Sequence, residues 1–127
     1  MTDWNGFLAL ANELAARDDM ASKRTAISRA YYCAYHIARQ PLAADGVMVS
    51  EGGQGHHLVW SELQRKGRAR AKIGDNGLKL HKLRIQADYA NHISDLTHAT
   101  TEAMSLAIVV LRLLTIELNK HPTQRAP

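Results

Sequence analysis

LKLHKLRIQADYANH, residues 78–92, is the stretch around which the fold is organised. Apolar Leu80, Leu83, Ile85 and Ala87 run through it, as in a buried helix. Five polar or aromatic residues gather towards its C-terminal end: Arg84, Asp88, Tyr89, Asn91 and His92. Polar groups packed so densely beside apolar ones must hydrogen-bond to each other or line a site. The stretch therefore predicts a buried helix, over about 78–90, that ends in a candidate functional site.

The N-terminal part of the chain has the pattern of two further helices. Trp4–Arg17 carries apolar residues at i, i+3 and i+4 spacing, and Asp3 is placed to cap it. The next helix is expected to begin at Ser22 and to end near residue 40, where Pro41 follows. Its inner face is rich in alanine, so a neighbouring helix can approach closely. The short connection between these two helices predicts an antiparallel pair.

Two more helices are expected in the remaining sequence. One covers 56–65, with Trp60 at an edge, and the longest runs from Thr97, as its cap, to Asn119. The segment 66–77 contains three glycines and several cations, which predicts a mobile basic loop. The chain is therefore expected to form an all-α, up-and-down bundle of four to five helices.

Composition places this bundle in one domain. A chain of 127 residues with 46% hydrophobic residues can bury a single core over 1–120, leaving 121–127 as a flexible tail. One cysteine, Cys33, and an N-terminus without a signal-peptide pattern favour the cytoplasm. The most apolar run, 107–118, is interrupted by Arg112 and Glu117, which favours a core helix over a membrane span.

The net charge of +4 is modest, but its distribution is uneven. Five cations with no acid among them fall within eight residues: Arg65, Lys66, Arg68, Arg70 and Lys72. Such a segment is usually a solvated surface. If the protein binds RNA, this is where contacts to phosphates are expected to concentrate.

Two strings together resemble a known family. SRAYYCAYH (28–36) is a small-residue, tyrosine-rich helix, and LRIQADY (83–89) follows some fifty residues later. Their order and spacing, in a chain of this length, resemble the HEPN superfamily, in particular its small stand-alone bacterial and archaeal members. The resemblance spans roughly residues 20–118 and implies a four- or five-helix bundle that forms a homodimer.

The resemblance also implies an activity and partners. Many HEPN proteins are metal-independent ribonucleases, often toxins of toxin–antitoxin or phage-defence systems, and small members are frequently encoded beside a minimal nucleotidyltransferase. The family signature is an arginine followed by a histidine after four to six intervening residues, paired across the dimer. No cofactor is implied.

Two arginine–histidine pairs are candidates for this signature. Arg84 and His92 lie on the expected helix but have seven residues between them, so one phosphate is within reach of both only if the helix breaks or a second protomer contributes. Arg29 and His36 have six residues between them but lie on the second helix. Arg84 and His92 are the first choice for the catalytic pair, with Arg29 and His36 second.

Each pair has a structural alternative. Arg84 and Asp88 are spaced for an i, i+4 ion pair, with Tyr89 then in the core and His92 at a helix end. Asp88, Tyr89 and Asn91 would otherwise serve as binding residues. Arg29, Tyr32 and His36 share one helix face. One possibility is that this face is an exposed stripe or a contact with another subunit. The other is that the face shares one cleft with Arg84, in which case Tyr32 helps to bind the substrate.

Other reactive side chains favour simpler interpretations. His56, His57 and His81 could suggest a metal, but their spacing and the lack of cysteine partners do not favour one. Cys33 lies three residues from His36, a spacing that fits a thiol nucleophile and its base, but its alanine and isoleucine neighbours favour a small core residue. We expect no bound metal.

The sequence thus leads to two hypotheses of different classes. The first is a HEPN-like dimer that acts on RNA, as a metal-independent endoribonuclease in a toxin or defence system. The second is a non-catalytic module that pairs with a nucleotidyltransferase partner, with a tyrosine such as Tyr89 as its modification target, or that binds a nucleotide between helices.

Overall fold

The computed structural model describes residues 3–49 and 53–120. This part of the chain forms helices and turns without strands, so the all-α prediction is confirmed. The five helices are α1 (Asn5–Ala15), α2 (Met20–Ala44), α3 (Gly53–Gln64), α4 (Arg68–Tyr89) and α5 (Leu96–Lys120). The expected tail, 121–127, lies outside the described residues.

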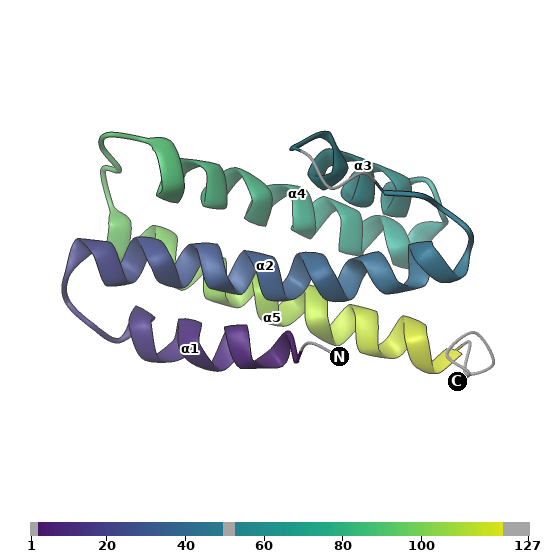
Figure 1. Cartoon of the computed structure of the whole chain (residues 1–127), viewed down its shortest axis with the longest axis horizontal. Coiled ribbons are helices and arrows are strands. Elements are labelled where there is room, and N and C mark those ends of the chain that lie inside the picture. The colour runs from purple at the N-terminus through teal and green to yellow at the C-terminus, as the bar shows by residue number, and fades with distance from the viewer. Residues whose placement is uncertain (1–2, 50–52, 121–127) are drawn as a thin grey trace.

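The three long helices α2, α4 and α5 form the body of the bundle (Figure 1). They pack against each other and alternate in direction, α1 lies along α2, and α3 lies against α4. The core contains small residues of α2 such as Ala30 and Ala34, which are fully buried and let the neighbouring helices approach. The up-and-down arrangement places the two strings 28–36 and 83–89 on adjacent helices.

The segment 66–77 is not a loop; residues 68–77 are the first half of α4, and that prediction was wrong. Two of its glycines, Gly74 and Gly77, face Trp60 of α3, and a Cβ at Gly77 would overlap the indole ring. Glycine normally weakens a helix interior, but here it makes room for a tryptophan side chain. Trp60 is fully buried rather than at an edge. Burial of the Trp60 side chain offsets the cost of placing glycines inside a helix, and helix propensity alone does not include that gain.

The boundaries of α2 also differ from the expectation. Its cap is Asp19, whose carboxylate accepts the N–H of Ser22 at 2.9 Å and whose pKa is lowered by that hydrogen bonding. The helix continues through Pro41 to Ala44. Proline removes one hydrogen bond of the helix. Only one further turn follows, and the buried side chain of Leu42 offsets that loss.

Aspartate side chains bind the N-terminal ends of α1 and α5. Asp3 accepts the Asn5 N–H at 3.1 Å, although the cap position itself is Trp4. Asp95, and not Thr97, caps α5 by accepting the N–H of His98 at 3.0 Å. Both aspartates thus bind N–H groups that the first turn of a helix leaves without partners.

One cation of α2 fixes the end of α4. The Arg24 guanidinium donates to the carbonyl oxygens of Ala87 and Ala90, at 3.1 and 2.7 Å. A cation stabilises a helix C-terminus because the last carbonyl groups carry partial negative charge. α4 therefore ends at Tyr89, and His92 lies beyond it in a non-helical segment.

α5 is long and apolar enough to span a membrane by length and composition alone. Core helices pass the same test, and α5 packs against α2 and α4, with Ala103, Ala107 and Val110 fully buried. Its inner face therefore supplies part of the bundle core.

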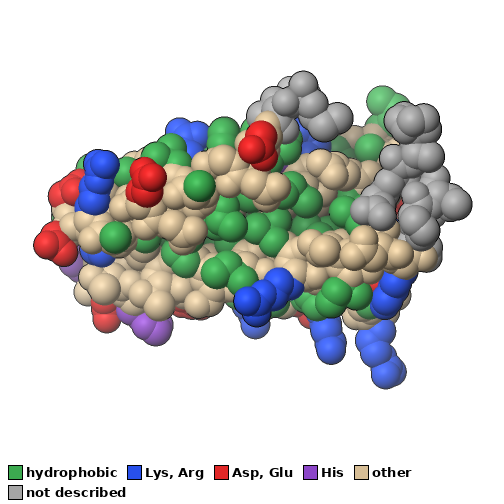
Figure 2. Space-filling model, turned by 90° about the horizontal axis from the view of Figure 1, so that it is seen from below, with side chains coloured by type: hydrophobic (Ala, Val, Ile, Leu, Met, Phe, Trp, Pro, Cys, Tyr) green, Lys and Arg blue, Asp and Glu red, His purple; other side chains and the backbone are tan. Residues whose placement is uncertain are grey.

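α1 covers only part of the face that α2 and α5 share, because it is much the shorter helix (Figure 1). Figure 2 shows this face, where hydrophobic side chains gather along the middle. A pocket of about 460 Å³ lies at the N-terminal end of α1, and its walls include Trp4, Ile37, Gln40 and Leu111. None of the candidate catalytic or binding residues named from the sequence lines this pocket.

Candidate functional site

The two strings that carry the family resemblance meet in the structure. Arg84 of α4 is buried, with 7% of its surface exposed. Its guanidinium carbon lies 5.3 Å from the ring centre of Tyr31 and 5.5 Å from that of Tyr32, both on α2. Contacts of this length between a guanidinium and an aromatic face are attractive. The side chains of Arg84 and Tyr32 are therefore in contact.

Tyr31 is the centre of this site. Its hydroxyl oxygen accepts the indole N–H of Trp60 at 3.1 Å and lies 2.8 Å from Nδ1 of His56. Burial raises the pKa of the Tyr31 hydroxyl, so the group keeps its proton. Since the hydroxyl accepts from Trp60, we assign its own proton to the bond with His56 Nδ1. The proton of the neutral His56 ring then lies on Nε2.

His56 and His81 stack on one another beside Tyr31. Their ring centres are 5.4 Å apart, and the His81 ring is also 5.2 Å from that of Tyr31. Burial, with a contribution from the Arg84 cation, lowers the pKa of His56 to about 4 and also lowers that of His81. Both imidazoles are therefore neutral near pH 7. We call Tyr31, His56, Trp60, His81 and Arg84 the histidine–arginine cluster.

The Arg84 guanidinium has few hydrogen bonds for a buried cation. One of its terminal nitrogens lies 3.4 Å from the Asp88 carboxylate, a long contact for a charged pair. Its buried Nε has no hydrogen-bond partner within residues 3–49 and 53–120. The expected Arg84–Asp88 ion pair is thus present, but it leaves donor capacity on the guanidinium for a further acceptor.

Arg29 and His36 lie under α1. The His36 ring stacks on Trp4 with 3.6 Å between ring centres, and the Arg29 guanidinium carbon is 5.4 Å from the ring centre of Phe7. Tyr32 lies between this side of α2 and the cluster, with its ring 6.1 Å from that of His36. The shared face of these residues is therefore neither an open stripe nor a single cleft with Arg84, because α1 covers much of it.

Three candidate residues that follow Arg84 are exposed: Tyr89, Asn91 and His92. Tyr89 has 74% of its surface exposed, so the alternative that placed it in the core was wrong. Asn91 and His92 are also exposed, in the segment after α4. The contacts of Arg84 are with Asp88 and the two tyrosines, and its electrostatic effects are on His56 and His81. Within one chain, the Arg84 cation therefore helps to lower the pKa values of these two histidines.

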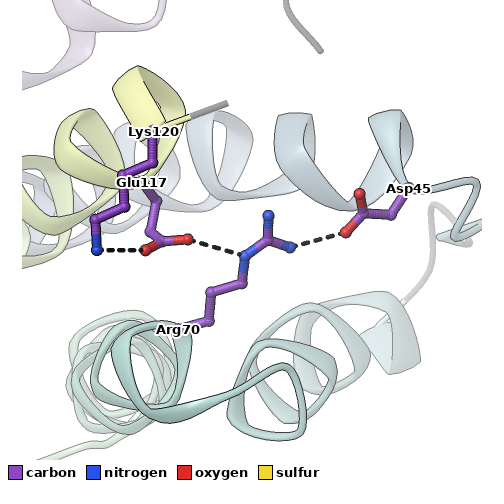
Figure 3. A network of polar contacts seen from close by, with 4 residues as sticks. All are labelled: Asp45, Arg70, Glu117 and Lys120. Carbon is purple, nitrogen blue, oxygen red and sulfur yellow. Dashed lines mark hydrogen bonds and ion pairs between the residues drawn. The ribbon is translucent and has the colours of Figure 1, made fainter. Parts of the chain in front are cut away.

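The five cations expected to form a basic loop have different surroundings. Arg70 is buried and bonds to Asp45 at 2.8 Å and to Glu117 at 3.2 Å, while Lys120 also contacts Glu117 (Figure 3). We call these four residues the Arg70 network. Arg65 is exposed and pairs with Glu62 at 3.3 Å. Lys66, Arg68 and Lys72 are exposed. Arg70 is thus held inside the bundle and is not available to a phosphate.

The remaining reactive groups have ordinary explanations. No group of three metal-ligating side chains occurs among the residues that the structure describes. Cys33 is fully buried, and burial raises the pKa of its thiol to about 11, so it is protonated and inert at neutral pH. The prediction that Cys33 is a core residue is confirmed.

Sequence reasoning missed the packing of two histidines against Tyr31. On sequence grounds His56 and His81 were candidates only for a metal site, and Tyr31 was only part of the tyrosine-rich string 28–36. One local signal was present: His81 precedes Arg84 by three residues, so both lie on neighbouring sides of α4. The contact with His56 depends on how α3 packs against α2 and α4, which no local pattern contains.

Comparison of the chain with models of known protein families, with curated proteins and with solved structures finds no match.

Proposed function

We propose that this protein is a HEPN-like cytoplasmic protein that acts on RNA, and that the histidine–arginine cluster is a metal-independent endoribonuclease site. The observation that carries the proposal is the position of Arg84. Packing of α4 on α2 brings this buried cation, with an unpaired Nε donor, against Tyr31, whose ring also contacts two neutral imidazoles. A toxin or defence role and a homodimeric assembly follow from the family resemblance.

RNA can be cleaved without a metal by attack of a 2′-hydroxyl on the adjacent phosphorus. In the proposed reaction, the neutral ring of His81 accepts the 2′-hydroxyl proton as the new P–O bond forms. Arg84 and the Nε2–H of His56 stabilise the charge that develops on the phosphorane oxygens. The bond from phosphorus to the 5′-oxygen then breaks, and that oxygen takes a proton from the His81 imidazolium. The products are a 2′,3′-cyclic phosphate and a 5′-hydroxyl.

The test is incubation of the purified protein with RNA in EDTA, followed by analysis of fragment ends. We expect fragments with cyclic phosphate ends from the wild type. His81→Ala should lower the rate by roughly 10²- to 10⁴-fold, the usual contribution of a general base. His98→Ala, at an exposed histidine of α5, is the matched control and should leave the rate unchanged. Intact RNA with the wild-type protein would end the proposal.

Two further variants locate the site. Arg84→Lys keeps the charge but not the planar set of donors, and it should slow cleavage while the protein stays folded. His92→Ala separates the cluster from the pair first chosen on sequence grounds. If His92→Ala abolished cleavage and His81→Ala did not, the active pair would be Arg84 with His92, and the reaction assigned to the cluster would be wrong.

The second candidate is a non-catalytic module that docks a nucleotidyltransferase partner. The observation that favours it is the exposed end of α4, where Ile85 is 43% and Tyr89 is 74% exposed. An exposed tyrosine hydroxyl beside an apolar residue is accessible to a modifying enzyme. Co-expression with a nucleotidyltransferase encoded beside this protein should then give a mass gain on Tyr89, and Tyr89→Phe should remove it.

A further inference from the structure

α4 carries a continuous line of exposed side chains on the side that faces away from the bundle. Their positions alternate by four and three residues, the spacing that keeps side chains on one side of a helix. These residues, which we call the basic stripe, are Arg68, Lys72, Asp75, Lys79, Lys82, Gln86 and Tyr89. The stripe spans roughly 32 Å at 1.5 Å per residue. It omits buried Arg70 and extends beyond the basic segment noticed in the sequence.

The stripe has an excess of positive charge that the protein does not neutralise. Arg68, Lys72, Lys79 and Lys82 form no ion pair with any residue in the described part of the chain. Asp75 is the one acid in the stripe, and its carboxylate accepts a hydrogen bond from Gln64 at 2.7 Å. The stripe carries four cations and one carboxylate, which is already hydrogen-bonded to Gln64. Because of this excess of positive charge, the surface is complementary to a polyanion.

The C-terminal end of the stripe adjoins the histidine–arginine cluster. Lys82 follows His81 directly, and His81, Ile85 and Tyr89 are four residues apart along α4. These residues therefore lie on adjoining sides of the last three turns of α4. A strand held along the cations would reach Tyr89 and the edge of the cluster together.

We infer that the basic stripe is a binding track for single-stranded RNA, with Lys and Arg on its phosphates and the Tyr89 ring stacked on one unpaired base. The inference rests on the proposed function for the identity of the polymer. Tyr89 decides between single and double strands: an aromatic ring stacks on a base only where that base is unpaired. The ring is 74% exposed and follows the cations on the same side of the helix.

The test is binding of a short unstructured RNA to full-length His81→Ala protein, measured by fluorescence anisotropy over a range of NaCl concentrations. Four phosphate contacts predict a slope of about −3 in log K against log salt. Lys79→Ala with Lys82→Ala should make the slope shallower by about 1.4, at roughly 0.7 for each single-strand contact. Tyr89→Ala should weaken binding by about tenfold without changing the slope, and Tyr89→Phe should bind normally.

A matched control removes two exposed cations elsewhere. Arg17→Ala with Arg112→Ala takes the same charge from the α1–α2 connection and from the outer side of α5. This variant should keep the salt slope of the parent. If it loses as much slope as the stripe variant, the protein attracts RNA by net charge alone, and the inference is wrong.

Competition experiments cover the other polyanions. A duplex of the same sequence should compete poorly, since its bases are unavailable to Tyr89. Equal competition by duplex RNA, or by heparin, would overturn the assignment to a single strand. If the wild type binds RNA tightly through the stripe but does not cleave it, the binding track stands and the nuclease proposal is wrong. If the stripe variants cleave RNA as fast as the wild type, the nuclease proposal stands and the binding track is wrong.

Discussion

Two buried arginines on α4 have opposite surroundings. Arg70 and Arg84 are 9% and 7% exposed. Arg70 is held between two carboxylates at 2.8 and 3.2 Å (Figure 3), whereas Arg84 has one carboxylate at 3.4 Å and two tyrosine faces. A buried cation bonded to two carboxylates from other parts of the chain holds those parts together. A buried cation with an unpaired donor keeps hydrogen-bonding capacity. This difference is the reason for placing the proposed site at the Arg84 end of α4.

The largest expected effect comes from removing one arginine at a time. Arg70→Met leaves Asp45 and Glu117 without their shared cation, and breaking such a buried pair costs about 3–5 kcal/mol. Arg84→Met leaves only Asp88, whose side chain is 29% exposed and can be solvated. Arg84→Met should lower the free energy of unfolding by about 1–2 kcal/mol, because the contacts with the tyrosine rings are lost. Urea unfolding at pH 7 measures both, and equal losses would contradict the comparison.

The second prediction concerns the part of α4 between the two arginines. Gly77→Ala places a Cβ against the buried Trp60 ring, and overpacking of this kind costs about 3 kcal/mol. The matched control is Gly6→Ala in α1, where nothing lies within 4 Å of the new Cβ. That change should stabilise the protein by about 0.5 kcal/mol. If both variants unfold at the same urea concentration, Trp60 does not hold α3 on α4 as described.

The third prediction is a pH dependence that arises from the two histidines near Arg84. The pKa of His56 is about 4 in the folded protein and 6.5 when unperturbed, so the unfolded chain binds a proton first as the pH falls. Stability from the neutral ring is therefore present above pH 6.5 and is lost between pH 6.5 and 4. His81, with its pKa also lowered, acts in the same direction.

Unfolding free energies measured across that range should decline with falling pH in the wild type. His56→Gln should reduce the decline, because glutamine does not titrate. Lys23→Gln, at a cation whose Nζ donates to the Ala15 carbonyl away from the cluster, should keep the wild-type decline. An undiminished slope in His56→Gln would mean that the neutral form of His56 is not stabilised by folding.

The sequence was sufficient to predict the class of fold and most of its helices. Apolar periodicity located α1, α3 and α5 to within a few residues. It failed over 66–77 because glycines and cations normally mark loops, whereas Gly74 and Gly77 accommodate Trp60 from another helix. That packing is a tertiary effect, invisible in the local pattern.

The candidate site was predictable only in part. One of two alternatives placed Arg84 in a cleft with the face of Arg29, Tyr32 and His36; the structure brings only Tyr32 of that face against Arg84. The sequence did not place His56 or His81 near Arg84. His56 lies on α3, and its position depends on how α3 packs against the other helices. Arg70 shows the converse error: its charge suggested a surface role, but its partners, Asp45 and Glu117, are distant in sequence.

The insertion of Trp60 against α4 also gives the protein an internal optical probe. The chain has two tryptophans, Trp4 and Trp60. Trp60 is fully buried and donates its N–H to Tyr31, while Trp4 stacks on His36 where α1 meets α2. In a Trp4→Phe protein, the emission of Trp60 would report on the surroundings of Tyr31 alone. Ligand entry at that location could then be followed by fluorescence without attaching a dye.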